Sequence, residues 1–411
     1  MSVSWRLGVF LAAFYPLLGF KRAFFVIGAL LAVHGWILLL TRARELIQMP
    51  MVRQLAWIAG GFVVPLWLAL PDVSNFEHAA RETTMAMLYL PMLLSVAVLV
   101  ARHDLAVPFM RSAVFIATLW SLDACVQVVC GRDLMGMPLL DRAGAYWQSP
   151  MKFGYYMGFF GLFAWVCDLQ LNPGRLWRAI GLWLLITSGV LVGLNREAWL
   201  VYFPASVMIF WHLPLNSHPW RVWLALAMAL LAAAFFGCGW VLSASFQARI
   251  LQTLEALNGS YEALDAALSH RLGIWLPAWE LSKTHWFNGM GQDGFLQAFQ
   301  SVTPDPFHKA HGGGMYPHQV VLEVLTTAGL IGVIGIMIIL ITMWRVWQHG
   351  SVEARAMALP FLVYLSAIWF PVNTHRSFYS SELMMGNWMM LGFYVAILSG
   401  MPGRLRKAAA P

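Results

Sequence analysis

The chain has 411 residues, of which 60% are hydrophobic and 11% are charged. Soluble globular domains carry about 25% charged residues, so this composition excludes a soluble globular protein. The formal net charge of +7 fits arginines that flank membrane spans on the cytoplasmic side, and it also fits an anionic substrate. Nucleic-acid binding is not expected, because the chain has no soluble basic domain to provide it.

The apolar residues form runs of roughly bilayer-crossing length, separated by short charged or Pro/Gly-rich stretches. We therefore predict an all-α integral membrane protein with about 12 transmembrane helices. Some runs are shorter than the roughly 20 residues that a perpendicular helix needs, which predicts little tilt or local thinning of the bilayer. The predicted spans are residues 5–20, 23–41, 55–70, 85–101, 108–129, 152–171, 178–194, 198–215, 221–243, 319–345, 356–373 and 381–401.

The distribution of Lys and Arg predicts the orientation. An even number of spans places both termini on one side of the membrane. If that side is the cytoplasm, the cytoplasmic segments hold more Lys and Arg residues than the short outer loops do. This is the bias that the positive-inside rule describes, so we expect both termini in the cytoplasm.

One long segment, residues 244–318, interrupts the pattern between the ninth and tenth spans. A loop of this length in a compact protein is usually functional or disordered. Helical stretches near 246–257, 261–281 and 291–302 predict an ordered, large helical periplasmic loop. The predicted domains are spans one to nine in 1–243, a loop subdomain with the catalytic residues in 244–318, and spans ten to twelve with a cytoplasmic tail in 319–411.

The long loop ends at Tyr316-Pro317-His318, and the tenth predicted span follows at once. His318 is therefore expected at the mouth of a helix, at the outer membrane surface. Histidine readily accepts a proton near neutral pH, which makes His318 a candidate general base. A histidine that only caps the helix is the alternative. Tyr316 and Trp275 are candidates for contact with a substrate.

Two arginines form a second candidate group. Arg196 lies in the short outer connection between the seventh and eighth spans, where Glu197 offers a structural partner, and Arg271 lies in the long loop. The planar guanidinium fork suits phosphate oxygens. Together with His318, the two arginines would make a site for an anionic lipid diphosphate. For each arginine alone, a structural role is favoured.

The remaining polar residues have simpler interpretations. His285, His308, His311 and His318 match no strong zinc spacing, so we predict no metal and no cofactor. Three basic residues are expected on the outer side of the membrane: Lys21, Arg22 and Arg142. They could bind the anionic headgroup of a substrate, although anchoring of helix ends is favoured.

Two further patterns bear on function. Residues 289–294 match a G-x-G-x-x-G pattern, but no strand precedes them, so a tight turn is expected rather than a dinucleotide site. Asp123 and Asp168 lie in predicted spans and raise the hypothesis of transport.

Taken together, these positions resemble the O-antigen ligase family, within the superfamily of ligases and polymerases that act on lipid-linked glycans. One position departs from the family pattern: Gln319 stands where asparagine often follows the histidine. The resembling features are Arg196 before the eighth span, Arg271 with Trp275 four residues later, Gly289, Gly291 and Gly294 with Phe295, Pro317-His318 entering the tenth span, and then Glu323, Gly329 and Gly332.

The resemblance implies a metal-independent glycosyltransferase in the inner membrane of Gram-negative bacteria, with its active site facing the periplasm. The donor would be O-antigen polysaccharide on undecaprenyl diphosphate, and the acceptor a sugar hydroxyl of lipid A-core oligosaccharide. His318 would take the acceptor proton, and the acceptor oxygen would attack the anomeric carbon with inversion. Arg196 and Arg271 would stabilise the diphosphate leaving group.

Three alternatives stay open. An O-antigen polymerase and a protein O-oligosaccharyltransferase use the same class of donor with a different acceptor. The modest length of the chain and its single large late loop favour the ligase. A polytopic transporter or flippase is the alternative of another class.

Overall fold

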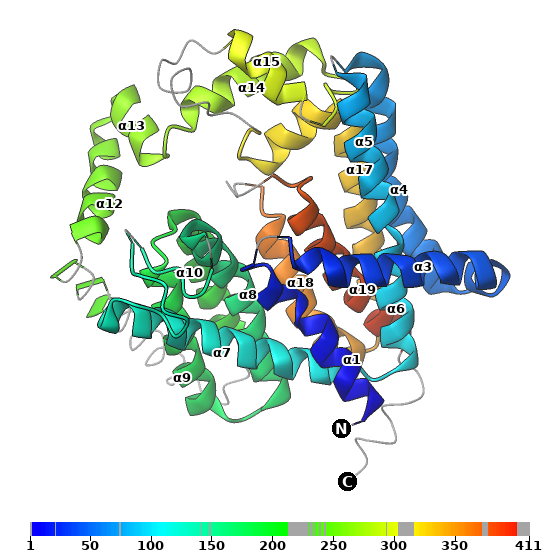
Figure 1. Cartoon of the computed structure of the whole chain (residues 1–411), viewed down its shortest axis with the longest axis horizontal. Helices are drawn as coiled ribbons and strands as arrows, with labels where there is room; N and C mark the ends of the chain where they lie inside the picture. Colours follow the sequence, from blue (N-terminus) through cyan, green and yellow to red (C-terminus); the bar gives the residue numbers. More distant parts are fainter. Residues whose placement is uncertain are drawn as a thin grey trace. The chain divides into compact units, whose positions relative to one another are not determined.

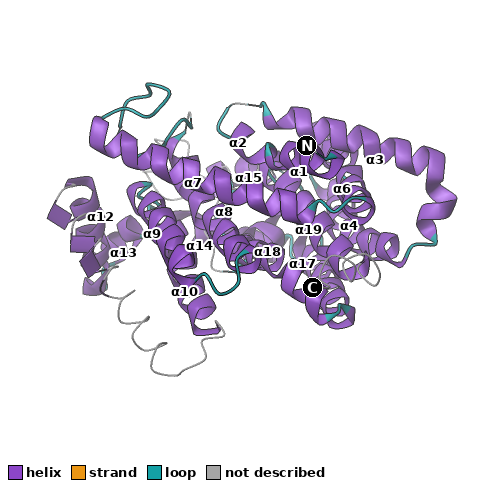
Figure 2. Cartoon of the chain, turned by 90° about the horizontal axis from the view of Figure 1, so that it is seen from below, coloured by secondary structure: helices purple, strands orange, loops and turns teal. Residues whose placement is uncertain are grey.

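A computed structural model of the chain describes residues 2–20, 22–73, 75–140, 142–147, 149–212, 230, 233–234, 236–237, 240–241, 244–292, 294–302, 316–371 and 377–400. In this part of the chain the regular secondary structure is helical and no strand occurs, which confirms the all-α class (Figure 2). The helices are α1 (Val3–Ala12), α2 (Phe14–Leu17), α3 (Phe24–Ile47), α4 (Pro50–Ala69), η1 (Leu70–Asp72), α5 (Phe76–Tyr89), α6 (Pro91–Arg102), α7 (Ala106–Cys130), α8 (Pro150–Leu171), α9 (Leu176–Val192), α10 (Arg196–His212), α12 (Ala244–Glu255), η2 (Ala256–Asn258), α13 (Tyr261–Ala267), α14 (Leu272–Thr284), α15 (Gly294–Val302), α17 (Val320–His349), α18 (Val352–Ile368) and α19 (Ser381–Gly400).

Helices lie at the predicted spans, except at 221–243, most of which is outside the described residues. Among the described residues, 6 helices are long and apolar enough to cross a membrane: α3, α4, the continuous pair α5–α6, α7, α17 and α19. The helices α9, α10 and α18 have 17 residues each, below the roughly 20 that a perpendicular span needs. The chain is therefore a helical membrane protein, and about 12 spans stay a prediction.

The chain forms two compact units, the first from Met1–Ser112 with Gly273–Pro411 and the second from Ala113–Leu272. In the first unit α17 packs along α4, and α19 packs against α6 and α18 (Figure 1). In the second unit α8 packs against α9 and α10. The compact units divide the chain after Ser112 and after Leu272. The division at 243 and 318, predicted from hydropathy, stays a prediction of membrane topology.

The predicted helix over 261–281 is wrong, because α13 ends at Ala267 and α14 begins at Leu272. Ser269 and His270 between them both have a φ of +59°, in the left-handed region that a right-handed helix cannot contain. The chain therefore reverses immediately before Arg271.

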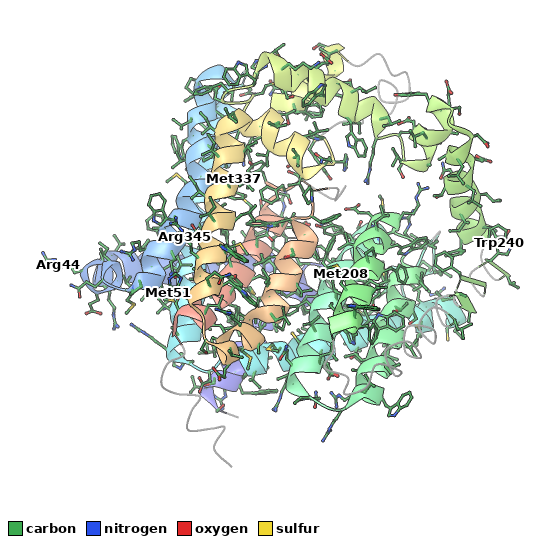
Figure 3. All side chains as sticks on the ribbon, turned by 180° about the vertical axis from the view of Figure 1, so that it is seen from behind. Arg44, Met51, Met208, Trp240, Met337 and Arg345 are labelled. Carbon is green, nitrogen blue, oxygen red and sulfur yellow. The ribbon has the colours of Figure 1, made fainter. Side chains whose placement is uncertain are left out.

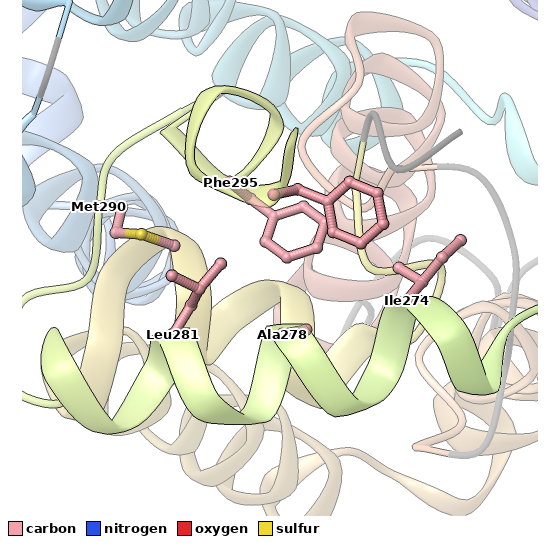
Figure 4. Close-up of a cluster of buried hydrophobic side chains, with 6 residues drawn as sticks. Ile274, Ala278, Leu281, Met290 and Phe295 are labelled. Carbon is pink, nitrogen blue, oxygen red and sulfur yellow. The ribbon is translucent and has the colours of Figure 1, made fainter. Parts of the chain in front are cut away.

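The helices α14 and α15 share a small apolar core with α17, all within the first unit. Leu322 of α17 packs against this core. Figure 4 shows the α14 side chains facing Met290 and the ring of Phe295. This part of the long loop therefore packs against α17. The buried members of the core are Ile274, Ala278, Leu281, Met290, Phe295 and Phe299.

Helix α17 is interrupted at Gly329, where φ is +58° and ψ is −151°. A helix break inside an apolar span leaves backbone groups without partners, which is unfavourable in lipid. Here the turn formed by residues 286–291 provides the partners. Four hydrogen bonds join them: Met290 N to Thr326 O at 2.7 Å, Gly291 N to Thr327 O at 2.9 Å, Leu330 N to Trp286 O at 2.8 Å and Ile331 N to Phe287 O at 3.1 Å.

This close contact explains the glycines that the sequence showed. A Cβ on Gly329 would lie 2.5 Å from the carbonyl carbon of Phe287, and one on Gly289 would lie 2.4 Å from the backbone nitrogen of Ala328. Gly289 and Gly291 also have φ values of +73° and +76°. Gly289 and Gly291 of the G-x-G-x-x-G pattern therefore lie in a tight turn, as expected, and this turn supplies hydrogen-bond partners to the interrupted helix α17.

We expect Gly329→Ala to destabilise the protein strongly. The backbone conformation at this position is one that only glycine adopts readily, which accounts for about 1–3 kcal/mol, and the clash with Phe287 adds to it. Gly60→Ala is the matched control, because Gly60 lies in α4 and a Cβ there meets nothing within 4 Å. Thermal unfolding in detergent should show a lowered Tm for Gly329→Ala alone. Equal Tm values for the two variants would contradict the packing described for Gly329.

Candidate functional site

Arg196 is the first residue of α10, in the second unit. The chain enters the helix through Leu194, whose φ is +47°, and through Asn195, whose Oδ1 accepts from the N–H of Ala198 at 3.1 Å. The Arg196 guanidinium donates to Ser269 Oγ at 2.8 Å and to Thr253 Oγ1 at 3.2 Å. Arg196 therefore ties the start of α10 to α12 and to the turn before α14.

Arg271 reaches the same region from the other side of that turn. Its Nη2 lies 3.6 Å from Oε2 of Glu197, the residue next to Arg196. The Arg271 side chain is 20% exposed and the Glu197 side chain 10% exposed. The structure therefore brings the two predicted arginines together around the first turn of α10.

Asp265 organises the turn that presents Arg271. It is buried, and its Oδ1 accepts from the N–H of Leu272 at 2.8 Å. Its Oδ2 lies 3.1 Å from Nδ1 of His270. These contacts hold the left-handed residues Ser269 and His270 in place, since such conformations persist only where their surroundings fix them. Asp265 was not among the residues predicted from the sequence, where its only signal is a carboxylate shortly before the arginine.

Glu197, the partner of Arg271, also has a perturbed pKa. Burial raises its pKa to about 7, and the opposing effect of Arg271 only partly offsets this. Its Oε1 is buried and forms no hydrogen bond within the described chain. Glu197 precedes the predicted span 198–215, so it lies at a helix end. A carboxyl group that changes charge near neutral pH therefore contacts one of the two predicted diphosphate ligands.

His318 lies in the first unit, one residue before the N-cap of α17. The N-cap is Gln319, whose Oε1 accepts from the N–H of Leu322 at 2.5 Å, so the capping alternative for His318 is wrong. His318 has a φ of +53°, an unfavourable conformation for a residue other than glycine. Such conformations cluster at active sites, where the surrounding structure holds them.

Tyr316 and Trp275, which were predicted to contact a substrate, lie beside the segment that holds His318. The rings of Tyr316 and His318 have their centroids 4.1 Å apart. Trp275, on α14, donates its indole N–H to the carbonyl of Pro317 at 3.0 Å. The structure thus brings all three predicted residues of this group together, and α14 supports the backbone at His318.

Gln319 and Glu323 hold a distant part of the chain against the first turn of α17. Gln319 Nε2 donates to the carbonyl of Pro371 at 2.6 Å. The buried Glu323 carboxylate accepts from the hydroxyl of Ser377 and from two backbone N–H groups of residues 377–379, at 2.5 to 3.3 Å. The segment 372–376 between these anchors lies outside the described residues. Gln319, which stands where the family pattern often has asparagine, thus forms hydrogen bonds with both the nitrogen and the oxygen of its side-chain amide.

The other predicted cations stay predictions. Arg22 is exposed just before α3, and Arg142 is half-buried in the connection between α7 and α8. Lys21, His308 and His311 lie outside the described residues. Within the part of the chain that the structure describes, no group of three or more His, Cys, Asp or Glu residues could hold a metal ion.

The two buried acids that raised the transport hypothesis have structural partners. Asp123 Oδ1 accepts from the N–H of Leu134 at 2.7 Å. Asp168 Oδ1 lies 2.9 Å from Nη2 of Arg178 and accepts from Nδ2 of Asn172 at 2.9 Å. Both carboxylates therefore stabilise chain connections, and neither contact favours transport.

Part of the chain matches a known protein family. Residues 180–337 match the family model described as O-antigen ligase. The matched segment begins in α9 and ends within α17, so it contains Arg196, Arg271 and His318. A comparison with curated proteins finds no match for the chain.

Proposed function

Because the match over residues 180–337 assigns this chain to the O-antigen ligase family, we propose that it transfers O-antigen from undecaprenyl diphosphate to a lipid A-core sugar. Family membership makes the chain a glycan-processing enzyme of the ligase or polymerase type. The donor, the acceptor and the location in the periplasmic face of a bacterial inner membrane belong to the proposal.

The observation that carries the proposal is the grouping of two arginines at the first turn of α10. Arg196 and Arg271 come from distant positions, and both belong to the matched segment. Two guanidinium groups can each bind phosphate oxygens with several N–H donors. A lipid diphosphate is the class of donor that such a pair suits.

The reaction is written as a single displacement. An imidazole nitrogen of His318 takes the proton of the acceptor hydroxyl, and the acceptor oxygen forms a bond to the anomeric carbon. The bond from that carbon to the diphosphate oxygen breaks, and undecaprenyl diphosphate leaves with the electron pair. Arg196 and Arg271 stabilise the charge that develops on it. The mechanism requires His318 and the arginine pair to meet at one donor.

Reconstitution tests this proposal directly. Purified protein in nanodiscs would receive a defined glycan on undecaprenyl diphosphate and rough lipopolysaccharide, without nucleotide sugar or an ion gradient. A ligase gives lipopolysaccharide that carries the glycan. Longer lipid-linked chains without modified lipopolysaccharide would indicate a polymerase, and glycan on added acceptor protein would indicate a protein O-oligosaccharyltransferase. If none of these products forms in any of the assays, the proposal of glycosyl transfer is overturned.

The pH dependence of donor binding follows from Glu197. Above pH 7 the ionised carboxylate pairs with Arg271, whereas protonation frees that guanidinium for a diphosphate. A bound diphosphate favours the neutral carboxyl, so binding takes up a proton and affinity falls as pH rises through 7. Glu197→Gln should remove this dependence, because the amide resembles the protonated acid. The Kd for an undecaprenyl diphosphate analogue between pH 6 and 9 measures the effect.

Glu280→Gln is the matched control, because Glu280 is exposed and its partner Lys283 lies on the same helix. This variant should keep the pH dependence of the unmodified protein. A Glu197→Gln variant that also keeps it would show that Glu197 does not exchange its proton on donor binding.

A further inference from the structure

Residues 131–140, here named the apolar turn, follow α7 in the second unit and extend from its end as a loop (Figure 2). Arg132 and Pro138 form an isolated antiparallel bridge across its base. Gly131 and Gly136 have φ values of +74° and +84°, which allow the tight reversals.

Six N–H groups of the apolar turn donate hydrogen bonds within the second unit. Between Asp133 and Leu139 every N–H group has an acceptor within the second unit, and Pro138 has no N–H to satisfy. Asp133 is buried and accepts three of these bonds, two at its carboxylate and one at its backbone carbonyl. The bonds run from Asp133 N to Met137 O, Leu134 N to Asp123 Oδ1, Met135 N to Asp133 Oδ1, Gly136 N to Asp133 O, Met137 N to Asp133 Oδ1 and Leu139 N to Gly131 O, at 2.7 to 3.0 Å.

Buried polar side chains of helix α7 form hydrogen bonds with this turn. Asp123 provides one of the acceptors just given, and Gln127, one turn further along the helix, is also buried. Gln127 Nε2 donates to the carbonyls of Met137 and Pro138 at 3.3 and 3.2 Å. The conformation of the turn is therefore fixed by buried polar groups before any partner binds.

The side chains of the turn do not fill a core. Leu134 is 64% exposed, Met135 63%, Leu140 62% and Met137 41%. A loop in water normally has polar side chains outside and bonds part of its backbone to water. In the apolar turn the hydrophobic side chains face outward and six N–H groups are bonded within the protein, which lowers the cost of placing the segment beside lipid.

The position of the turn in the chain identifies what covers it. Helix α7 is a candidate membrane span, and it ends at Cys130, one residue before the turn. Val129 at this end is 84% exposed, so the apolar surface continues from the helix into the turn. Arg132 is exposed beside it and suits an anionic lipid phosphate.

We propose that the apolar turn lies in the lipid interface of the bilayer that α7 crosses, with Leu134, Met135 and Met137 among the upper acyl chains. Arg132 contacts anionic headgroups on the aqueous side of these acyl chains. The turn is a preformed membrane anchor, and this role is independent of the glycosyl-transfer function proposed above.

Methionine methyl NMR tests this placement on the full chain in nanodiscs. Met135→Leu, which conserves volume, assigns the Met135 signal, and Met337 on α17 (Figure 3), 49% exposed on a candidate span, gives a lipid reference. Nitroxide-labelled lipid should broaden the Met135 and Met137 signals, and a water-soluble gadolinium chelate should not. The protection should be greater in phosphatidylglycerol than in phosphatidylcholine, and Arg132→Glu should remove that difference.

Two results would overturn the proposal. Relaxation of Met135 by the chelate as strong as in the denatured chain, without broadening by nitroxide lipid, would place the turn in water. Protection from both agents would mean that protein covers it. Leu134→Asp combined with Met135→Asp provides a second test, since the Met137 signal should then become accessible to the chelate. Pro173→Asp, in the exposed turn between α8 and α9, should leave the Met137 signal unchanged.

Discussion

His318→Ala should lower the rate of glycan transfer by about 10²–10⁴-fold, the contribution that a positioned general base makes. Alanine cannot take the acceptor proton, so the attacking oxygen remains a weak nucleophile. Expression and membrane insertion should be unchanged, because Gln319 rather than His318 caps α17. The measurement is the initial rate of transfer by purified protein at saturating donor and acceptor.

His285→Ala is the matched control for this experiment. His285 lies just after α14 in the same unit and is half-buried, and its Nδ1 lies 2.9 Å from Oγ1 of Thr284. It has no role in the proposed mechanism, so its variant should retain the full rate. Near-normal transfer by His318→Ala would end the assignment of His318 as the base.

Arg271→Ala should reduce transfer by about 10²–10³-fold, the loss typical when one group that stabilises developing charge is removed. The variant also leaves Glu197 buried without its cation, so the first turn of α10 should be less stable. Arg271→Lys keeps the charge but loses the planar fork, so it should restore only part of the activity. Rates at saturating donor separate the loss of catalysis from the loss of binding.

Arg175→Ala serves as the control for the arginine experiment. Arg175 is exposed at the start of α9 in the same unit, and its side chain makes no capping hydrogen bond. Its loss should leave the rate unchanged. If Arg271→Ala bound the donor and turned over as the unmodified protein does, the diphosphate role of Arg271 would be disproved.

Hydropathy predicted where the helices lie, because the length of an apolar run is a local property of the sequence. It did not predict the break at Gly329, since a glycine in an apolar run is compatible with a continuous helix. The break depends on residues 286–291, far away in the chain. The error at 261–281 has a local cause, because Asp265 inside the predicted helix becomes buried and accepts from the N–H of Leu272 across the turn that ends α13.

The site residues show the same division between local and distant information. Residue chemistry sufficed to choose Arg196, Arg271 and His318, and the structure groups the two arginines and surrounds His318 with Tyr316 and Trp275. The raised pKa of Glu197 could not be predicted, because it arises from burial in the folded chain. The meeting of His318 with the arginine pair at one donor stays a prediction.

The interruption of α17 has a consequence for biogenesis. During insertion, an isolated segment 320–349 has no turn at residues 286–291 beside it, so a continuous helix is the form that lipid tolerates. The opening at Gly329 can then form only when that turn docks and its four hydrogen bonds replace those of the helix. We therefore expect a maturation step after insertion, in which the embedded helix exchanges backbone hydrogen-bond partners with residues 286–291.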